Sequence, residues 1–469
     1  MTGFSNPILP GFNPDPTIVC RGDNYFLATS TFEYFPGVPI YTSIDLVDWQ
    51  LIGHALNRRS QLDMRTAEAA AGIYAPTLRY NERRERWYMT TACVFKNAKK
   101  ADHDSPPPPR GFYVWTDNIW DETKWSDPVY YDVAGIDQDL FFDDDGKVWL
   151  SWATTIPDHI DQPGHFSLTV WTVQIDLDTG DNIGQPKLIR QNTTFGNRVA
   201  EGPHIFKKDG VYYLITAEGG TEIEHSEWIC RSTDGPRGPW EVGPQSTVNP
   251  MVYNGLDYDV MQTGHMDMVE GKDGQWWAVC LAVRPQRGIL SHLGRETFLA
   301  PVEWKDGWPV VNAGRKIGLT GPEDSGLRRI RNQQSWKTKF NKDLDLYKNG
   351  WYHCRTPIKP YHGLSSAGLI LKCGQYALQH DEAVSMLLKK QTAFVGTWHI
   401  EFEFEPTWPG EEAGVTVWWS KWAHCSVSIR GKRGTACWPE GQYGAELVFR
   451  KPKEEGNDFE VGRLLHCGY

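Results

Sequence analysis

RGDNYFLATS, residues 21–30, is the first of five similar stretches in this chain. Each has a charged or glycine-containing turn followed by bulky strand-forming residues and an apolar run. The other four are RRERWYMTTA (83–92), DDGKVWLSWA (144–153), KDGVYYLITA (208–217) and KDGQWWAVCL (272–281). Aromatic markers at positions 25, 87, 149, 213 and 277 give intervals of 62, 62, 64 and 64 residues. A long repeat of short strands and turns is typical of propeller blades, so the sequence predicts a five-bladed β-propeller.

Charged side chains occupy equivalent positions ahead of these turns. Asp137, Glu201 and His265 each lie nine residues before the turn glycine of their own repeat, and Asp15 lies seven residues before the first turn glycine. Equivalent positions in equivalent blades should point the same way, so we expect these four side chains to converge on the propeller axis. Carboxylates that face one another are unfavourable unless one is protonated or a ligand intervenes, and such clusters are typical of functional sites.

Length and composition limit the class of protein. A chain of 469 residues exceeds a single core and predicts two domains. The net charge of −11 argues against a nucleic-acid partner, whose phosphates need a basic surface. No apolar run has the length of a transmembrane helix, so no membrane partner is expected. The 22 tryptophans suit either core packing or stacking on sugar rings, and a neutral oligosaccharide remains compatible as a ligand.

Cysteine usage and the start of the chain bear on the compartment. Nine cysteines without a CxxC pair, several of them inside strand-like runs, predict buried reduced thiols rather than disulfides or a metal site. The first residues, MTGFSNPILPGFNPDP, show no signal peptide. We therefore expect an intracellular protein, or a secreted one if a leader has been removed.

The repeats end near residue 312 and a polar stretch with a Gly-Pro pair follows. Runs with period-two alternation come next, among them WHIEFEFEP from position 398, GVTVWWSKW from 414, CSVSIRG from 425 and AELVFRK from 445. Such alternation is typical of half-buried antiparallel strands. We therefore predict an all-β protein in which residues 1–318 form the propeller, which is the catalytic domain, and residues 325–469 form a C-terminal β-sandwich domain.

Three acids of the expected cluster match the needs of glycoside hydrolysis. That reaction requires one carboxylic acid to protonate the leaving oxygen and one carboxylate to activate water or attack the anomeric carbon. Asp15, Asp137 and Glu201 supply this pair and one more acid, and Asp15 and Glu201 lie among Pro, Gly and apolar neighbours in FNPDPTI and VAEGPHIF. The alternative is that Asp15 caps a turn and Glu201 bonds nearby amides.

Several motifs together resemble glycoside hydrolase family 43, the β-xylosidases and α-L-arabinofuranosidases that act on arabinoxylan. They are GFNPDPTI, STFEYFPGVPIYTSIDLVDWQLIGHAL, IDQDLFFDDDGK, AEGPHIFKKDGVYYLITAEGGT, TGHMDMVE and LGRETF. The resemblance covers residues 6 to about 308, and the downstream part is similar in placement to the β-sandwich that often follows the propeller in this family.

The resemblance implies roles for the three acids. Asp15 would be the general base that activates water, and Glu201 would be the general acid. Asp137 would be the third carboxylate, which positions Glu201 and raises its pKa by like-charge repulsion. Enzymes of this family invert the anomeric centre, so the base and the acid would act on opposite faces of the sugar.

The resemblance also implies substrate contacts. Phe32 would stack on the sugar, His265 would lie at the bottom of the pocket, and Arg295 would bond sugar hydroxyls and compensate the acids. The alternative for Phe32 is an aromatic residue of the core, and that for His265 is a buried histidine with its hydrogen bonds satisfied. The alternative for Arg295 is an ordinary ion pair with its neighbour Glu296.

Tyr74 stands where many β-xylosidases of the family have tryptophan, a replacement that also occurs in relatives that remove arabinofuranose. We expect Asp139, in the same strand as Asp137, to be solvated rather than an outer sugar contact. No cofactor is required by the expected chemistry. The resemblance leaves open a hydrated structural calcium ion near the propeller axis, next to His265.

We therefore predict an inverting exo-glycoside hydrolase that releases terminal β-D-xylose from xylo-oligosaccharides or arabinoxylan fragments. The alternative is an α-L-arabinofuranosidase that removes arabinose side chains, and one pocket could serve both sugars. Two other classes are a non-catalytic carbohydrate-binding propeller, which would not need three acids in register, and a protein-interaction propeller. The last is supported only by the proline-rich segment 96–111, for which a loop at the rim of the propeller is the other explanation.

Overall fold

The structure is a computed structural model that describes residues 3–95, 108–155, 167–192, 197–257, 259–286, 288–327, 335–432, 444–453 and 459–466. Within these ranges the chain is all-β, with short 3₁₀ turns such as Glu122–Lys124, Asn312–Gly314 and Glu323–Ser325. None of the described helices is long and apolar enough to cross a membrane. Most of the proline-rich segment and part of the predicted linker, residues 328–334, lie outside the described residues.

The first two thirds of the chain form five antiparallel four-stranded sheets in chain order. Sheet 1 contains β1 (Thr17–Arg21), β2 (Asn24–Ala28), β4 (Gly37–Ser43) and β5 (Gln50–Leu56). Sheet 2 contains β6 (Gly72–Asn81), β7 (Arg86–Val94), β8 (Arg110–Thr116) and β9 (Val129–Ala134). Sheet 3 contains β10 (Ile136–Phe142), β11 (Val148–Thr154), β12 (Thr169–Ile175) and β13 (Asn182–Gln191).

Sheet 4 contains β14 (Asn197–Lys208), β15 (Val211–Gly219), β16 (Ser226–Ser232) and β17 (Glu241–Val242). Sheet 5 contains β18 (Met261–Glu270), β19 (Trp276–Val283), β20 (Arg295–Lys305) and β21 (Trp308–Val311). Each of the five repeated sequence stretches forms the hairpin between the first and second strands of one sheet. The first strands contact one another in turn, β1 with β6, β6 with β10, β10 with β14, β14 with β18, and β18 with β1, so they close a ring.

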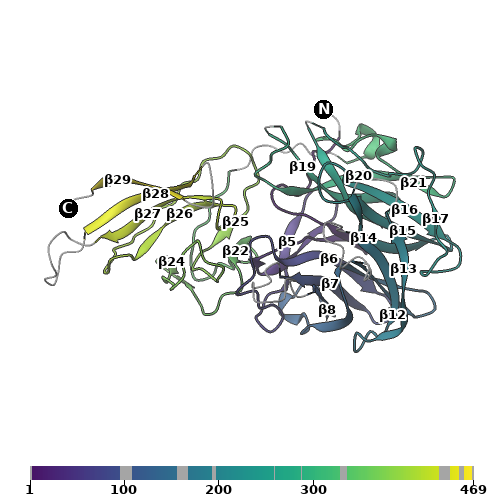
Figure 1. Cartoon of the computed structure of the whole chain (residues 1–469), viewed down its shortest axis with the longest axis horizontal. Helices are drawn as coiled ribbons and strands as arrows, with labels where there is room; N and C mark the ends of the chain where they lie inside the picture. The colour runs from purple at the N-terminus through teal and green to yellow at the C-terminus, as the bar shows by residue number, and fades with distance from the viewer. Residues whose placement is uncertain are drawn as a thin grey trace.

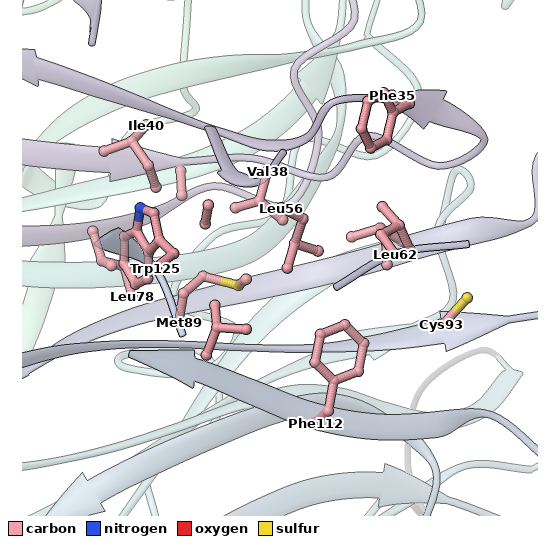
Figure 2. Packing of buried hydrophobic residues seen from close by; sticks show 14 of the residues in the cluster. Phe35, Val38, Ile40, Leu56, Leu62, Leu78, Met89, Cys93, Phe112 and Trp125 are labelled. Atoms are coloured by element: carbon pink, nitrogen blue, oxygen red, sulfur yellow. The ribbon is translucent and has the colours of Figure 1, made fainter. Parts of the chain in front are cut away.

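Hydrophobic side chains fill the space between neighbouring sheets. Between sheets 1 and 2, Val38 and Leu56 face Leu78 and Met89, and Trp125 lies beside them (Figure 2). All five are at most 1% exposed. Burying a side chain of this kind stabilises the fold by about 1.5–3 kcal/mol. The packing between sheets holds the first strands, which carry the predicted site, in a fixed arrangement.

The last third of the chain forms smaller sheets at one side of the five (Figure 1). One sheet contains β26 (Glu412–Trp418), β27 (His424–Lys432), β28 (Gly444–Pro452) and β29 (Phe459–His466), and another pairs β23 (His362–Ser365) with β24 (Gly368–Leu371). The prediction of a strand from position 398 is wrong, because this segment pairs with no other described strand. The side chains of Trp398, Ile400 and Phe402 are 47%, 52% and 45% exposed. Alternation alone predicted a strand there, but alternation does not supply a neighbouring strand.

The C-terminal part is joined to the first five sheets through β22 (Trp351–Cys354), which pairs with both β25 (Leu388–Lys389) and β3 (Tyr34–Phe35). The next residue, Arg355, is 1% exposed; its guanidinium donates to the carbonyl oxygen of Ala67 and pairs with Asp381 at 2.9 Å. Lys390 donates from Nζ to Oδ1 of Asn13 at 2.6 Å. The two parts of the chain therefore share a sheet and buried polar contacts.

Seven cysteines lie in the described residues and all are free thiols. Four are buried as the sequence predicted, namely Cys93, Cys230, Cys280 and Cys354. Cys20 is half-buried, and Cys373 and Cys425 are exposed, so the prediction of buried thiols is wrong for these last two. Both exposed thiols belong to the C-terminal part, where the described sheets leave many side chains open to solvent.

Candidate active site

One residue in the left-handed backbone region occurs at the same place in each of the five sheets. These residues are Asp15 (φ 53°), Ala75 (φ 26°), Asp137 (φ 58°), Gly202 (φ 55°) and His265 (φ 49°). In sheets 2 to 5 the pairing of the first strand is irregular at this point, as in a β-bulge. Bulges redirect side chains, and left-handed non-glycine residues carry strain that is common at functional sites. The repeated bulge explains why Asp15, Asp137 and His265 are directed to one place, whereas Glu201 lies one residue before the left-handed position of its sheet, Gly202.

The structure brings the predicted residues Asp15, Asp137, Glu201 and His265 together. All four are buried, with exposed fractions of 5–7%. Oδ1 of Asp15 lies 3.6 Å from Nδ1 of His265, and Oδ2 of Asp137 accepts a hydrogen bond from the backbone N–H of Gly202, the residue after Glu201, at 2.9 Å. The residues therefore form one cluster across sheets 3, 4 and 5 and the segment before β1.

Asp15 is held in its charged form. Burial opposes ionisation, but the guanidinium of Arg295 and the imidazole of His265 lower the pKa of Asp15 below its ordinary value. Nη1 of Arg295 lies 3.3 Å from Oδ1, and the hydroxyl of Ser30 donates to Oδ2 at 2.6 Å. A buried carboxylate that stays ionised can accept a proton from a water molecule.

Glu201 is held in its protonated form until near neutral pH. Burial raises its pKa to about 7, and the negative charge of Asp15 adds to this while Arg295 opposes it. Burial also raises the pKa of Asp137 to about 7, with His265 opposing and the charges of Glu201 and Asp15 adding. Burial, rather than repulsion by Asp137, is thus the main reason that Glu201 retains its proton. Asp15 and Glu201 therefore differ in charge at pH 6, as a base and an acid must.

Aromatic rings border the acids. The ring of Phe32 lies 4.7 Å from that of Tyr74 and 5.3 Å from that of Phe12, and the guanidinium of Arg295 lies 5.2 Å from the Phe32 centroid. Phe32 also has a left-handed backbone, with φ 51°. The hydroxyl of Tyr74 donates to the carbonyl oxygen of Ala70 at 2.6 Å. These rings offer apolar faces of the kind that stack on a sugar ring.

The structure rules out the ion pair of Arg295 with Glu296, which was the alternative for Arg295, and the expectation of a solvated Asp139 is wrong. Arg295 does not pair with its neighbour, because both carboxylate oxygens of Glu296 accept from Arg284, at 2.6 and 2.9 Å. Asp139 is not solvated: it is 1% exposed and its Oδ1 lies 3.0 Å from Nε of Arg79. Asp139 lies two residues after Asp137 in one strand, and only the arrangement of the five first strands shows that its surroundings are enclosed.

Sequence reasoning missed Phe12, Ser30 and His225. His225 is fully buried, its Nδ1 lies 3.0 Å from the carbonyl oxygen of Gln262, and burial lowers its pKa to about 4. Its ring packs against Gly264, where an added Cβ would come within 2.7 Å of it. The turn before β16 that holds His225 has no counterpart in the repeat, so spacing gave no signal, whereas Phe12 could have been noticed as the aromatic residue of GFNPDPTI.

The resemblance left open a calcium ion near His265. Calcium takes six to eight oxygen ligands. In the part of the chain that the structure describes, no group of three His, Cys, Asp or Glu side chains could hold a metal ion. Asp15, the carboxylate beside His265, already bonds Ser30 and Arg295. The side chains around His265 do not fit a directly coordinated calcium ion, and we derive no step through one.

Comparison with known proteins adds independent findings. A family model described as "Glycosyl hydrolases family 43" matches residues 4–309, and one described as "Beta xylosidase C-terminal Concanavalin A-like domain" matches residues 337–448. The chain is similar to a non-reducing end α-L-arabinofuranosidase of Bacteroides ovatus, with 36% identity over 92% of this chain and 76% of the relative. It is also similar to a xylan 1,3-β-xylosidase of a Vibrio species, with 34% identity over 90% of this chain and 78% of the relative.

Among solved structures, a xylan β-1,4-xylosidase from Bacillus halodurans superposes with a TM-score of 0.79 at 29% identity. The match covers 98% of this chain and 83% of that one. A Bacteroides ovatus structure described as xyloglucan PUL GH43B has the same TM-score at 33% identity, over 98% of this chain and 84% of that one. The similarity thus extends over both parts of the chain.

Proposed function

Because this chain belongs to glycosyl hydrolase family 43 and is a glycosidase, we propose that it removes a terminal β-D-xylose from xylo-oligosaccharides or arabinoxylan fragments. Release of α-L-arabinofuranose is the alternative, and the similar relatives carry names of both kinds. An enzyme named xylosidase/arabinosidase 43B from Humicola insolens, 32% identical over 97% of this chain and 82% of its own length, combines the two activities in its name.

We infer that the five sheets form a five-bladed β-propeller. The closed ring of first strands and the repeated hairpins support this arrangement. For the C-terminal part we infer a β-sandwich, in line with the match to a concanavalin A-like domain. Domain limits of 1–318 and 325–469 are part of this proposal, and the boundary between the two family matches lies in the same region.

In the proposed reaction, ionised Asp15 takes a proton from a water molecule. At the same time the oxygen of that water forms a bond to the anomeric carbon. The glycosidic bond breaks on the opposite face, and Glu201 gives its proton to the leaving oxygen. The next water restores the two protonation states. Asp137 orients the strand segment that carries Glu201 through its bond to the Gly202 N–H. The products are a pentose with inverted configuration and a shortened chain.

The remaining residues would hold the sugar. Phe32 and Tyr74 supply faces for stacking, and Arg295, which already bonds Asp15, supplies further N–H donors for hydroxyl groups. His265 lies beside Asp15 and keeps its carboxylate charged. Tyr74 uses its hydroxyl on Ala70, so its ring rather than its hydroxyl would face the sugar.

The observation that carries the proposal is a pair of buried acids in opposite protonation states. Asp15, with its lowered pKa, stays ionised, and Glu201, with a pKa of about 7, stays protonated until near neutral pH. Hydrolysis of nitrophenyl β-D-xyloside and nitrophenyl α-L-arabinofuranoside by the wild-type protein tests it. We expect cleavage of at least one substrate, with loss of about 10²-fold or more in Asp15→Asn. Binding of xylo-oligosaccharides without hydrolysis of either substrate would instead favour the non-catalytic propeller.

A further inference from the structure

A second ring of buried residues follows the five left-handed residues along the chain. Each of its members lies two positions after the left-handed residue of its sheet. We call this set the axial ring: Thr17, Thr77, Asp139, His204 and Asp267. All five are at most 4% exposed. Since each member is separated by one residue from a left-handed position, any shift of the ring moves the strand segments that carry the candidate catalytic groups.

Arg79, from β6, links the axial ring across the sheets. Its guanidinium contacts one ring member from each of the other four sheets. The contacts are Nη1 to Oγ1 of Thr17 at 3.3 Å, Nε to Oδ1 of Asp139 at 3.0 Å, Nη2 to Nδ1 of His204 at 3.0 Å, and Nη1 to Oδ2 of Asp267 at 2.7 Å. One side chain thus joins all five first strands. Only a planar group with several divergent N–H donors can do this.

The surrounding groups complete the cluster. Oδ2 of Asp267 also accepts from the Thr17 hydroxyl at 2.7 Å and from the Ile18 N–H at 3.0 Å. Although burial opposes its ionisation, the charge of Arg79 holds the pKa of Asp267 at about 2. Nη2 of Arg79 also lies 3.0 Å from Nδ1 of His204, so the same guanidinium reaches the ring member of sheet 4. Arg79 is therefore the cation that compensates two buried carboxylates.

We propose that Arg79 is a positioning residue for the hydrolysis, because it fixes the first strands so that Asp15, Asp137 and Glu201 face one another. This inference rests on the proposed function. Catalytic groups must be held within about 0.5 Å of their working geometry, and a displacement of about 1 Å can lower the rate by about 10²-fold. Arg79 does not touch the sugar in this arrangement, so its effect falls on kcat rather than on substrate binding.

A matched control exists elsewhere in the same part of the molecule. Like Arg79, Arg190 is a half-buried arginine in an ion pair, with its Nε 2.6 Å from Oε1 of the fully buried Glu218. It joins β13 to β15, and the hydrogen bonds and ion pairs of Arg190 and Glu218 among the described residues involve no axial-ring residue. Removal of Arg190 should cost stability for the same reason as removal of Arg79, because the first leaves one buried carboxylate unpaired and the second leaves two.

The experiment compares Arg79→Lys, Arg79→Met and Arg190→Met with the wild type, by thermal unfolding and by kcat and KM on the better nitrophenyl substrate. We expect both Arg79 variants to lose about 10-fold or more in kcat with KM changed less than about threefold, since a lysine cannot bridge four sheets. Arg190→Met should unfold at a lower temperature but keep its kcat within about twofold. If Arg79→Met does not fold, Arg79→Lys, which retains the charge, decides the comparison.

Equal kcat values for Arg79→Lys, Arg190→Met and the wild type would overturn the inference and leave Arg79 a structural residue only. Failure of the wild type to cleave either substrate would refute the proposed function instead. In that case crystal structures of the wild type and Arg79→Lys decide the inference without any substrate. Displacement of the Asp15 or Asp137 carboxylate by more than about 0.5 Å supports it, and unmoved carboxylates overturn it.

Discussion

Oδ2 of Asp137 accepts a hydrogen bond from the backbone N–H of Gly202 at 2.9 Å, so Asp137 holds the strand at the residue directly after Glu201. This contact acts on the position of Glu201, whereas the raised pKa of Glu201 comes first from its own burial. The two effects can be separated, because asparagine retains an oxygen that accepts the Gly202 N–H but carries no charge.

Asp137→Asn should therefore move the basic limb of the kcat/KM profile only slightly, to lower pH by less than about one pH unit. The direction follows because a nearby negative charge favours the protonated form of Glu201, and the variant removes that charge. The rate should fall as well, by up to about 10²-fold. Asp143→Asn is the control, because Asp143 is a buried acid that directly follows the strand of Asp137, at the end away from Asp137. Coupled acids titrate with shared macroscopic pKa values, so the direction in which the limb moves is the decisive result. A basic limb that moves to higher pH would contradict the assignment of Asp137 as the third carboxylate.

The leaving group distinguishes the acid from the base. Glu201→Gln should lose about 10²–10⁴-fold in kcat/KM on xylobiose, whose leaving oxygen needs a proton, and much less on a nitrophenyl glycoside. Asp15→Asn should lose a similar factor on both substrates, because both need an activated water. Steady-state kinetics on the two substrates measure this difference. Equal losses for Glu201→Gln on both substrates would show that Glu201 is not the general acid.

The stereochemistry of the first product tests the single-displacement mechanism. A β-xyloside should yield α-xylose first, which proton NMR detects before mutarotation mixes the anomers. Initial β-xylose would require a covalent intermediate and would exclude Asp15 as a base that acts through water.

Lys390 makes the stability of the fold depend on pH. Burial lowers its pKa to about 7, against about 10.4 in an unfolded chain. The folded state therefore releases this proton at lower pH than the unfolded state, so stability rises from pH 7 toward pH 10 and the full cost of the buried charge is present below pH 7. Lys390→Met should raise the unfolding temperature most at pH 6, with a gain of no more than about 5 kcal/mol that shrinks toward pH 10.

The neighbouring Lys389 provides the control for this measurement. Lys389 is half-buried and donates to the carbonyl oxygen of Asn349 at 2.6 Å. Lys389→Met should change the unfolding temperature less, and with a weaker dependence on pH, because burial lowers the pKa of Lys389 less than that of Lys390. A gain for Lys390→Met that is the same at pH 6 and pH 10 would mean that Lys390 is not buried in its charged form.

The sequence by itself determined the repeat and, with it, which residues share a position. The hairpins of five sheets follow the five repeated stretches, and spacing grouped Asp15, Asp137, Glu201 and His265, although Glu201 lies one residue before the position equivalent to Asp137 and His265. Family membership was also predictable from local motifs and is confirmed by the family match over residues 4–309.

Only the tertiary structure decided which charges meet. Arg295 pairs with Asp15 across 280 residues of chain, and Arg79 meets Asp139 and Asp267, although nothing in the sequence marks these partners. It also decided that burial is the main cause of the raised pKa of Glu201. Spacing along a strand determines on which side a residue lies. Pairing and desolvation depend instead on how the closed ring of first strands encloses that side, because they arise from contacts between segments far apart in the chain.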